Sequence, residues 1–257
     1  MAPDFSNNLP DYESFRRPFP NRIFTEMVQR KIGLPGQRIA DIGSGTGLVG
    51  HGLAGVPLDL IELDVNENLV RAAQSRRQTA LPQSPISANI KSVVARAESC
   101  PLPDTFFDGI IVAQSWHWFD RVLAPTEMLR ILKPGRPIAV AYYMHVPGAH
   151  DIAGQTEKLI LQFQPNWRHH NSAGINGQVL RDFQANGFKE IESLSFDIEE
   201  LFSAQQWMGY VRTLGVCNEM PPANLEKLMA KLAALLSNTS ETFPILHRAF
   251  LAFGKKS

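Results

Sequence analysis

The sequence predicts an α/β fold in which a mostly parallel sheet carries helices on both faces. Apolar runs of strand length alternate with amphipathic runs of helix length through the first half of the chain, and this alternation is typical of a parallel sheet. A glycine-rich turn over 43–47 follows the first apolar run and opens a helix. In folds of this class such a turn lies at the carboxyl edge of the sheet, where ligands bind.

Seven strands are expected. They span 38–42, 58–63 with Asp64 at its tip, 90–95, 106–113, 137–143, 188–196 and 247–253. The first five are near-continuous apolar runs, which is typical of parallel strands covered on both faces. We expect the last two strands to form a hairpin-like antiparallel edge.

Helices are expected where apolar residues recur at helical spacing. Their ranges are 21–32, 46–53, 66–75, 122–132, 152–163, 178–186, 203–214 and 224–236. Local signals mark several ends. Gly33 and Pro134 stop the helices before them, and Ser203 with Gln206 forms a capping box that begins another.

We expect one domain over 21–257, because 257 residues suit an α/β fold that carries insertions. A polar, proline-bearing segment over 1–20 precedes it. The pattern changes after His145. We expect the segments 146–177 and 199–240 to form a mainly helical cap over the carboxyl edge of the sheet.

The composition narrows the classes of partner. Lys plus Arg number 25 and Asp plus Glu number 25, and a net charge of zero counts against a nucleic-acid partner. Cys100 and Cys217 have neither metal-ligand nor disulfide-framework spacing. No apolar run is long enough to cross a bilayer, and the first residues lack the pattern of a secretion signal. We expect a cytoplasmic protein with no metal site and no membrane partner. The oligomeric state stays open.

The residues around the turn indicate a nucleotide ligand. Gly45, Gly47 and Gly50 fit the spacing of a dinucleotide fingerprint, and Asp64 follows near the distance expected for a ribose contact. However, Asp41 directly precedes the turn, where its carboxylate would repel a pyrophosphate. A cationic ligand such as S-adenosyl-L-methionine, with its sulfonium and α-ammonium groups, suits this position better.

Several motifs occur in order between residues 12 and 143. They are Tyr12-x-x-Phe-Arg-x-Pro-Phe-Pro20, Asp41-Ile-Gly-Ser-Gly-Thr-Gly47, Asp64, Ala97-Glu98 with Leu102-Pro103 and Phe107-Asp108, Gln114-Ser-Trp-His-Trp-Phe-Asp120, and Leu132-Lys-Pro-Gly135. Together they resemble the class I S-adenosylmethionine-dependent methyltransferases with a type 11 domain, and more narrowly the branch of trans-aconitate methyltransferase-like proteins. The resemblance implies a Rossmann-like sheet of seven strands.

The resemblance also implies a cofactor site. Its residues would be Tyr12, Arg16, Asp41, Gly43, Ser44, Gly45, Gly47, Asp64, Val65, Ala97, Glu98 and Gln114. Asp41 would lie near the α-ammonium, Asp64 would accept both ribose hydroxyls, and Gln114 would lie beside the methyl group. Ala97 and Glu98 would lie at the adenine. The segment 1–20 looks like a lid, with Arg16 as a partner for the methionine carboxylate.

Three arginines depart from the pattern of these enzymes. Arg96 stands where an aspartate usually meets the adenine amino group, Arg17 replaces a proline, and Arg136 replaces a glycine. With Arg96 at this position, Glu98 or backbone groups would have to contact the edge of the adenine instead.

Histidines are the candidate general bases, because their pKa lies near neutral pH. His117 follows the fourth strand and His145 the fifth, both at the carboxyl edge. The cluster around His117 could equally be packing that shapes a pocket wall. Side chains predicted to line the substrate pocket are Trp116, Trp118, His169 and His170, although the last two also suit a solvated turn.

The leading hypothesis is a methyltransferase that acts at oxygen or nitrogen of a small molecule, for instance a carboxylate, phenol or heterocycle of secondary metabolism. The chain lacks the Asn/Asp-Pro-Pro-Tyr/Phe element that clamps an amino group, so nucleic-acid N-methylation is disfavoured. Two alternatives remain open: a non-catalytic protein that binds S-adenosyl ligands, and an oxidoreductase that binds NAD(P).

Overall fold

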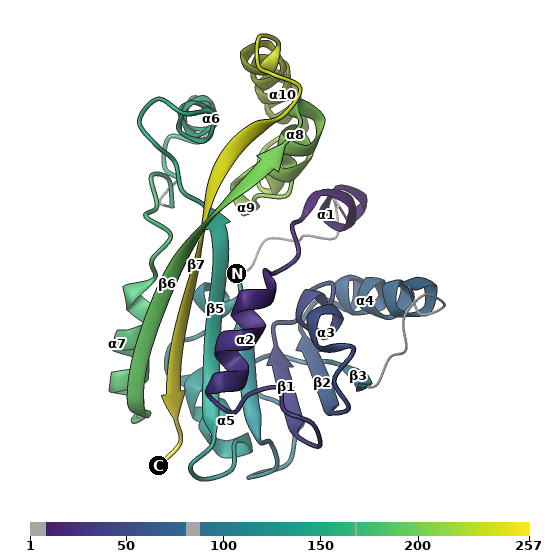
Figure 1. Ribbon diagram of the computed structural model, residues 1–257, viewed down its shortest axis with the longest axis vertical. Helices are drawn as coiled ribbons and strands as arrows, with labels where there is room; N and C mark the ends of the chain where they lie inside the picture. The colour runs from purple at the N-terminus through teal and green to yellow at the C-terminus, as the bar shows by residue number, and fades with distance from the viewer. Residues whose placement is uncertain (1–8, 81–87, 168) are drawn as a thin grey trace. The chain divides into compact units, whose positions relative to one another are not determined.

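The predicted sheet of seven mostly parallel strands is confirmed. The computed structural model describes residues 9–80, 88–167 and 169–257. The strand order is β3-β2-β1-β4-β5-β7-β6. β1 pairs in parallel with β2 and β4, and the pairs β2–β3 and β4–β5 are parallel as well. Figure 1 draws β7 with its arrowhead opposite to those of β5 and β6, so the expected antiparallel edge is present.

Each expected strand is found. The strands are β1 (Arg38–Ile42), β2 (Asp59–Asp64), β3 (Asn89–Val94), β4 (Gly109–Ala113), β5 (Pro137–His145), β6 (Lys189–Phe202) and β7 (Phe243–Lys255). The last two are longer than expected. The residues of β6 after Phe196 alternate between exposed and partly buried positions up to the buried Phe202, so they lack the continuous apolar run from which a strand was expected.

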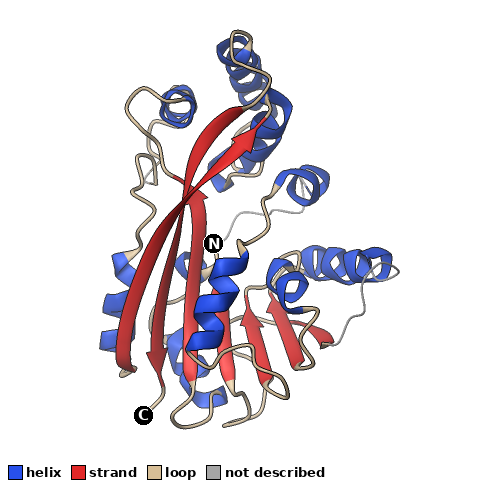
Figure 2. Cartoon of the chain, in the orientation of Figure 1, coloured by secondary structure: helices blue, strands red, loops and turns tan. Residues whose placement is uncertain are grey.

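All eight expected helices are found (Figure 2). They are α2 (Asn21–Gln29), α3 (Leu48–Leu53), α4 (Glu67–Ala80), α5 (Leu123–Ile131), α6 (Ile152–Leu161), α7 (Gly177–Ala185), α8 (Ala204–Arg212) and α10 (Pro222–Leu236). The capping box of Ser203 and Gln206 is present at α8. Unexpected are α1 (Leu9–Phe15), α9 (Gly215–Asn218) and a 3-10 turn, η3 (Trp116–Trp118). None of the described helices is long and apolar enough to cross a membrane.

The chain divides into two compact units. The sheet unit comprises residues 18–142, 176–195 and 250–257, and the helical unit comprises the described residues of 9–17, 143–175 and 196–249. Most of the two segments expected to form a cap falls in the helical unit. Their position over the carboxyl edge of the sheet stays a prediction.

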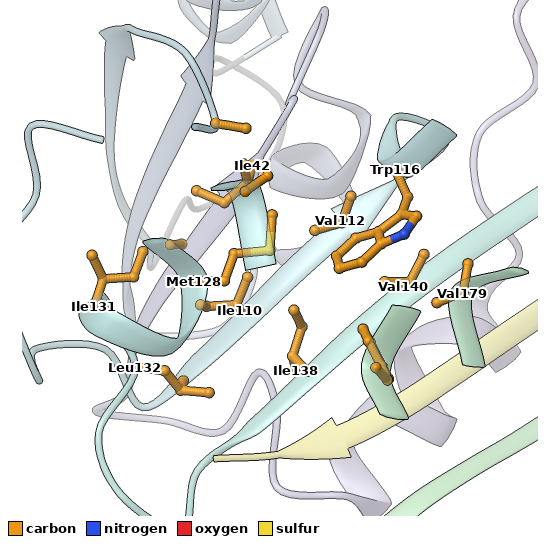
Figure 3. Packing of buried hydrophobic residues seen from close by; sticks show 14 of the residues in the cluster. Ile42, Ile110, Val112, Trp116, Met128, Ile131, Leu132, Ile138, Val140 and Val179 are labelled. Atoms are coloured by element: carbon orange, nitrogen blue, oxygen red, sulfur yellow. The ribbon is translucent and has the colours of Figure 1, made fainter. Parts of the chain in front are cut away.

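The sheet unit has a core on the face of the sheet that packs against α5 and α7 (Figure 3). Ile110 and Val112 of β4 alternate with residues that point to the other face, as strand geometry requires. Ile138 and Val140 do the same on β5. β1 and β4 both contribute to this core, and they lead into the glycine-rich turn and into the segment that begins at Gln114.

The helical unit has a separate core, built from α6, α8, α10 and the ends of β6 and β7. Its largest buried side chain is Trp207, whose Nε1 donates a hydrogen bond to Thr156 Oγ1 at 2.9 Å. Gly209 of α8 has no side chain where the ring of Phe15 packs, so α1 approaches α8 closely.

Candidate functional site

The glycine-rich turn after β1 has a backbone that only glycine adopts without strain. Gly43, Gly45 and Gly47 have φ of 73°, 56° and 77°, all in the left-handed region. A Cβ at Gly43 would collide with the side chain of Ser115, whereas one at Gly45 would meet no described atom within 4 Å. The turn is therefore tightly packed on one side and open at Gly45.

Hydrogen bonds fix the turn to the end of β2. The N–H groups of Gly43 and Ser44 donate to Leu63 O at 2.7 and 3.0 Å. Ser115, which follows β4, donates through Oγ to Ile42 O at 3.1 Å. Two neighbouring strands thus hold the backbone of the turn.

Asp64, at the tip of β2, is the third anchor of the turn. Its Oδ2 accepts the Gly45 N–H and its Oδ1 accepts the Asn66 N–H, each at 2.8 Å. Burial raises the pKa of Asp64, and the backbone hydrogen bonds only partly oppose that effect. The carboxylate predicted to bind ribose therefore also shapes the turn.

Asp41, in β1, is completely buried. Neither carboxylate oxygen has a hydrogen-bond partner among the described residues. Burial raises the pKa of Asp41 well above its usual value, and the nearby Glu62 and Asp64 raise it further. The expected acidic residue is thus beneath the turn rather than on its surface.

Glu62 was not among the predicted site residues. It is completely buried, forms an ion pair with Arg77 of α4, and its Oε2 also lies 3.3 Å from Ser92 Oγ. A Cβ at Gly50 would collide with Glu62 Oε1. The third glycine of the apparent dinucleotide fingerprint is therefore required by this buried glutamate. The available signal was a charged residue inside the apolar strand Asp59–Asp64.

The predicted adenine residues lie in the segment between β3 and β4. Ala97 is buried, and Glu98 is engaged within the protein: its Oε1 accepts the Asp120 N–H at 3.0 Å and its Oε2 lies 3.4 Å from Arg96 Nε. Val65, beyond β2, has 56% of its surface exposed. An exposed apolar side chain next to Asp64 is a suitable surface for a purine ring.

The segment after β4 begins with a strained residue. Gln114 has φ of 60°, in the left-handed region that non-glycine residues seldom adopt, and its N–H donates to Ala141 O at 2.9 Å. His117 is exposed, and its Nδ1 lies 3.2 Å from the hydroxyl of Tyr142. Its ring centre is 4.3 Å from that of Trp118.

Trp116 lies in the core of the sheet unit, as Figure 3 shows, and not on an open wall. Its Nε1 donates to Asp182 Oδ2 at 2.9 Å, and its ring packs edge-on against Phe183. The indole ring therefore anchors the segment that carries His117 and Trp118, and we do not assign it to a substrate pocket.

Five predicted site residues belong to the helical unit. They are Tyr12, Arg16, His145, His169 and His170. The guanidinium carbon of Arg16 lies 5.4 Å from the ring centre of Tyr12 and 5.6 Å from that of Tyr210. Its Nη1 donates to Thr213 Oγ1 at 3.3 Å. The predicted site residues Tyr12 and Arg16 are thus brought together within the helical unit.

His145 is buried, and both of its ring nitrogens are engaged. Nδ1 lies 3.3 Å from the Tyr210 hydroxyl and Nε2 lies 3.2 Å from Glu157 Oε1. These contacts give His145 a structural role in the core of the helical unit. His169 and His170 are exposed, and the ring centre of His170 lies 6.3 Å from that of Trp167.

Residues 40–140 match a family model described as a methyltransferase domain. An uncharacterized methyltransferase of Mycobacterium tuberculosis is 28% identical over 142 residues, which are 55% of this chain and 53% of that protein. The match thus spans about half the length of this curated relative.

Solved structures share the fold. A putative type II methyltransferase from Anaeromyxobacter dehalogenans has a TM-score of 0.66 at 22% identity, covering 94% of this chain and 98% of that one. Phosphoethanolamine N-methyltransferase 2 of Haemonchus contortus, solved with S-adenosyl-L-methionine, has a TM-score of 0.55 at 15% identity, covering 98% of this chain and 57% of that one. The chain thus matches a methyltransferase-domain model over residues 40–140 and shares its fold with these solved methyltransferases.

Proposed function

We propose that this protein transfers a methyl group from S-adenosyl-L-methionine to an oxygen or nitrogen atom of a small-molecule acceptor. The observation that carries the proposal is the turn after β1, in which three glycines at positive φ adjoin the buried Asp41. This turn lies within the range that the methyltransferase family model matches.

The chemistry of the turn fits the cofactor. Asp41 holds two carboxylate oxygens without a hydrogen-bond partner among the described residues, and Thr46 Oγ1 likewise has none. The open side of Gly45 lets a ligand approach the backbone closely. A buried carboxyl group without hydrogen-bond partners, close to a glycine that a ligand can approach, favours a cationic ligand over a pyrophosphate.

Asp64 and Val65 suit the nucleoside portion. The Asp64 carboxylate accepts backbone N–H groups of Gly45 and Asn66 and is also stabilised by that of Val65, and its four lone-pair positions leave capacity to accept from the ribose. Val65 would cover one face of the adenine. Glu98 already contacts Asp120 and Arg96. We therefore propose that it stabilises this segment and does not bind the edge of the adenine.

The bound cofactor supplies an electrophilic methyl carbon on a sulfonium group. The protein has to hold the acceptor atom in line at about 3 Å from that carbon, and such positioning can supply most of the rate. A carboxylate acceptor is already ionised at neutral pH, whereas a phenol or amine gains from a base.

We assign the role of base to His117 and a positioning role to Tyr142. Tyr142 is buried, and burial raises the pKa of its hydroxyl, so the hydroxyl keeps its proton at neutral pH. Its contact with Nδ1 orients the exposed imidazole.

A direct test is methyl transfer by the purified chain. Isotopically labelled S-adenosyl-L-methionine is incubated with panels of small carboxylates, phenols and nitrogen heterocycles, and mass spectrometry detects the labelled product. Binding of S-adenosylhomocysteine without transfer to any panel would favour the non-catalytic alternative. Tight binding of NADH without binding of S-adenosylhomocysteine would replace the proposal with an oxidoreductase.

A further inference from the structure

Three carboxyl groups share one buried face at the end of β1 and β2. Asp41 is the register partner of Glu62 on the neighbouring parallel strand, so their side chains point to the same face of the sheet. Asp64 follows Glu62 by two positions and points the same way. All three are buried.

The groups that surround Asp41 supply little positive charge. Glu62 and Asp64 face it from β2, and β4 places the apolar Ile111 beside it on the other flank. Arg77 of α4 contacts the group through its ion pair with Glu62. Gly47 in the turn and Gly50 in α3 lie against Glu62 Oε1 and carry no charged side chain.

In the free protein, the three carboxyl groups of this face are not all compensated by positive charge. Arg77 pairs with Oε2 of Glu62, whose Oε1 has no hydrogen-bond partner among the described residues, and backbone N–H groups solvate Asp64. Asp41 has neither a basic partner nor a hydrogen bond to either oxygen among the described residues. Burying an unpaired carboxylate next to like charges is costly, and the group takes up a proton instead.

We propose that burial, together with the carboxylate of Glu62 that Arg77 holds beneath the glycine-rich turn, keeps Asp41 protonated in the free protein, so that binding of the cationic cofactor expels this proton. The inference rests on the proposed function, because it places the α-ammonium of the ligand at the turn. Asp41 is buried, so its field reaches the turn through protein and not through water, where charges interact more weakly. A cation at the turn therefore favours the ionised carboxyl, whose proton passes to solvent.

The sign of the pH dependence follows from this release. Free protein binds one proton more than the complex, so the affinity for the ligand rises with pH. The rise reaches at most about tenfold per pH unit, the limit for one proton. The affinity stops rising above the pH at which Asp41 ionises in the free protein.

Isothermal titration calorimetry tests the proposal. S-adenosylhomocysteine, which carries the α-ammonium, is titrated at fixed pH into the whole chain in two buffers of different ionisation enthalpy. The difference between the two binding enthalpies gives the number of protons released. 5′-Methylthioadenosine, which has the nucleoside but no ammonium, serves as the matched ligand. We expect release of up to one proton for the first ligand and none for the second.

Glu62→Gln keeps the shape beneath Gly50 and removes one of the two like charges beside the buried Asp41, so we expect its proton release to fall below that of the unmodified chain. Glu67→Gln is the matched control, because Glu67 forms an exposed ion pair with Arg71 on α4. Equal release for both ligands, no release for either, or unchanged release in Glu62→Gln would overturn the inference. If the Glu62 variant fails to fold, the comparison of the two ligands on the unmodified chain decides. Failure of both ligands to bind would overturn the proposed function as well.

Discussion

At the level of single residues, the carboxyl end of β2 combines two tasks in one side chain. Asp64 fixes the turn through the Gly45 N–H and has lone pairs left for a ribose. The sequence indicated the second task, because an acid at a strand tip is part of the motif. The sequence gave no indication that Asp64 also fixes the turn, because that contact depends on the distance between two loops.

Asp64→Ala should weaken the binding of S-adenosylhomocysteine by about tenfold or more, because both an acceptor and an anchor of the turn are lost. Calorimetric titration measures the change. Asp59→Ala is a suitable control, since Asp59 lies at the exposed start of the same strand. Unchanged affinity in the Asp64 variant would refute the ribose assignment.

His117→Ala should lower turnover by about a hundredfold or more if His117 is a base, with little effect on cofactor binding. Tyr142→Phe should shift the pH profile of turnover, because it removes the hydroxyl at Nδ1. Both are measured with an acceptor found in the transfer experiment. Equal activity of the alanine variant at every pH would make His117 a wall residue.

At the level of elements, the sequence predicted the helices and strands whose buried residues form a regular apolar pattern. The strands β1, β4 and β5 are almost entirely buried and read as apolar runs. α1 has no buried residue, so it leaves no apolar stripe to detect, and α9 has only four residues. The turn was predictable because its positive φ values demand glycine.

Glu62 shows why part of the candidate site could not be predicted. Its partner Arg77 lies on another element, and only the folded register places Asp41 beside it. From sequence, Gly50 was a mark of dinucleotide binding. In the structure it makes room for Glu62, and that contact is between elements distant in the chain.

Gly50→Ala should therefore destabilise the protein by about 1–3 kcal/mol, as overpacking does in well-filled cores. The expected signature is a lower thermal unfolding midpoint. At Gly55 a Cβ would meet no described atom within 4 Å, so Gly55→Ala is the control. A midpoint equal to that of the control would show that Glu62 can move aside freely.

At the level of the whole molecule, the chain has two units with separate cores. The residues of β5, β6 and β7 are each divided between the two units. The sheet unit contains the turn and the acids. The predicted cap and the narrower resemblance to the trans-aconitate branch stay predictions, because the residues that would decide them carry no motif.

The buried acid of the sheet unit should reduce the stability of the free protein at neutral pH. The pKa of Asp41 is raised in the folded state, so the unfolded chain gives up this proton more readily, and stability falls as the pH rises above about 4. Asp41→Asn removes that cost. We expect a higher thermal unfolding midpoint at pH 7, a gain that shrinks towards pH 4, and weaker binding of S-adenosylhomocysteine. Asp59→Asn should show none of these. A midpoint for Asp41→Asn below that of the unmodified chain at pH 7 would contradict the assignment.

Trp116 also bears on how the protein could be altered by engineering. Its indole is held by Asp182 and Phe183, whereas the next two rings, His117 and Trp118, stand on this fixed base nearer the surface. Randomised libraries at position 118, with His117 kept as the base, should therefore yield mostly folded variants with altered acceptor choice. Libraries that include position 116 should yield mostly insoluble protein.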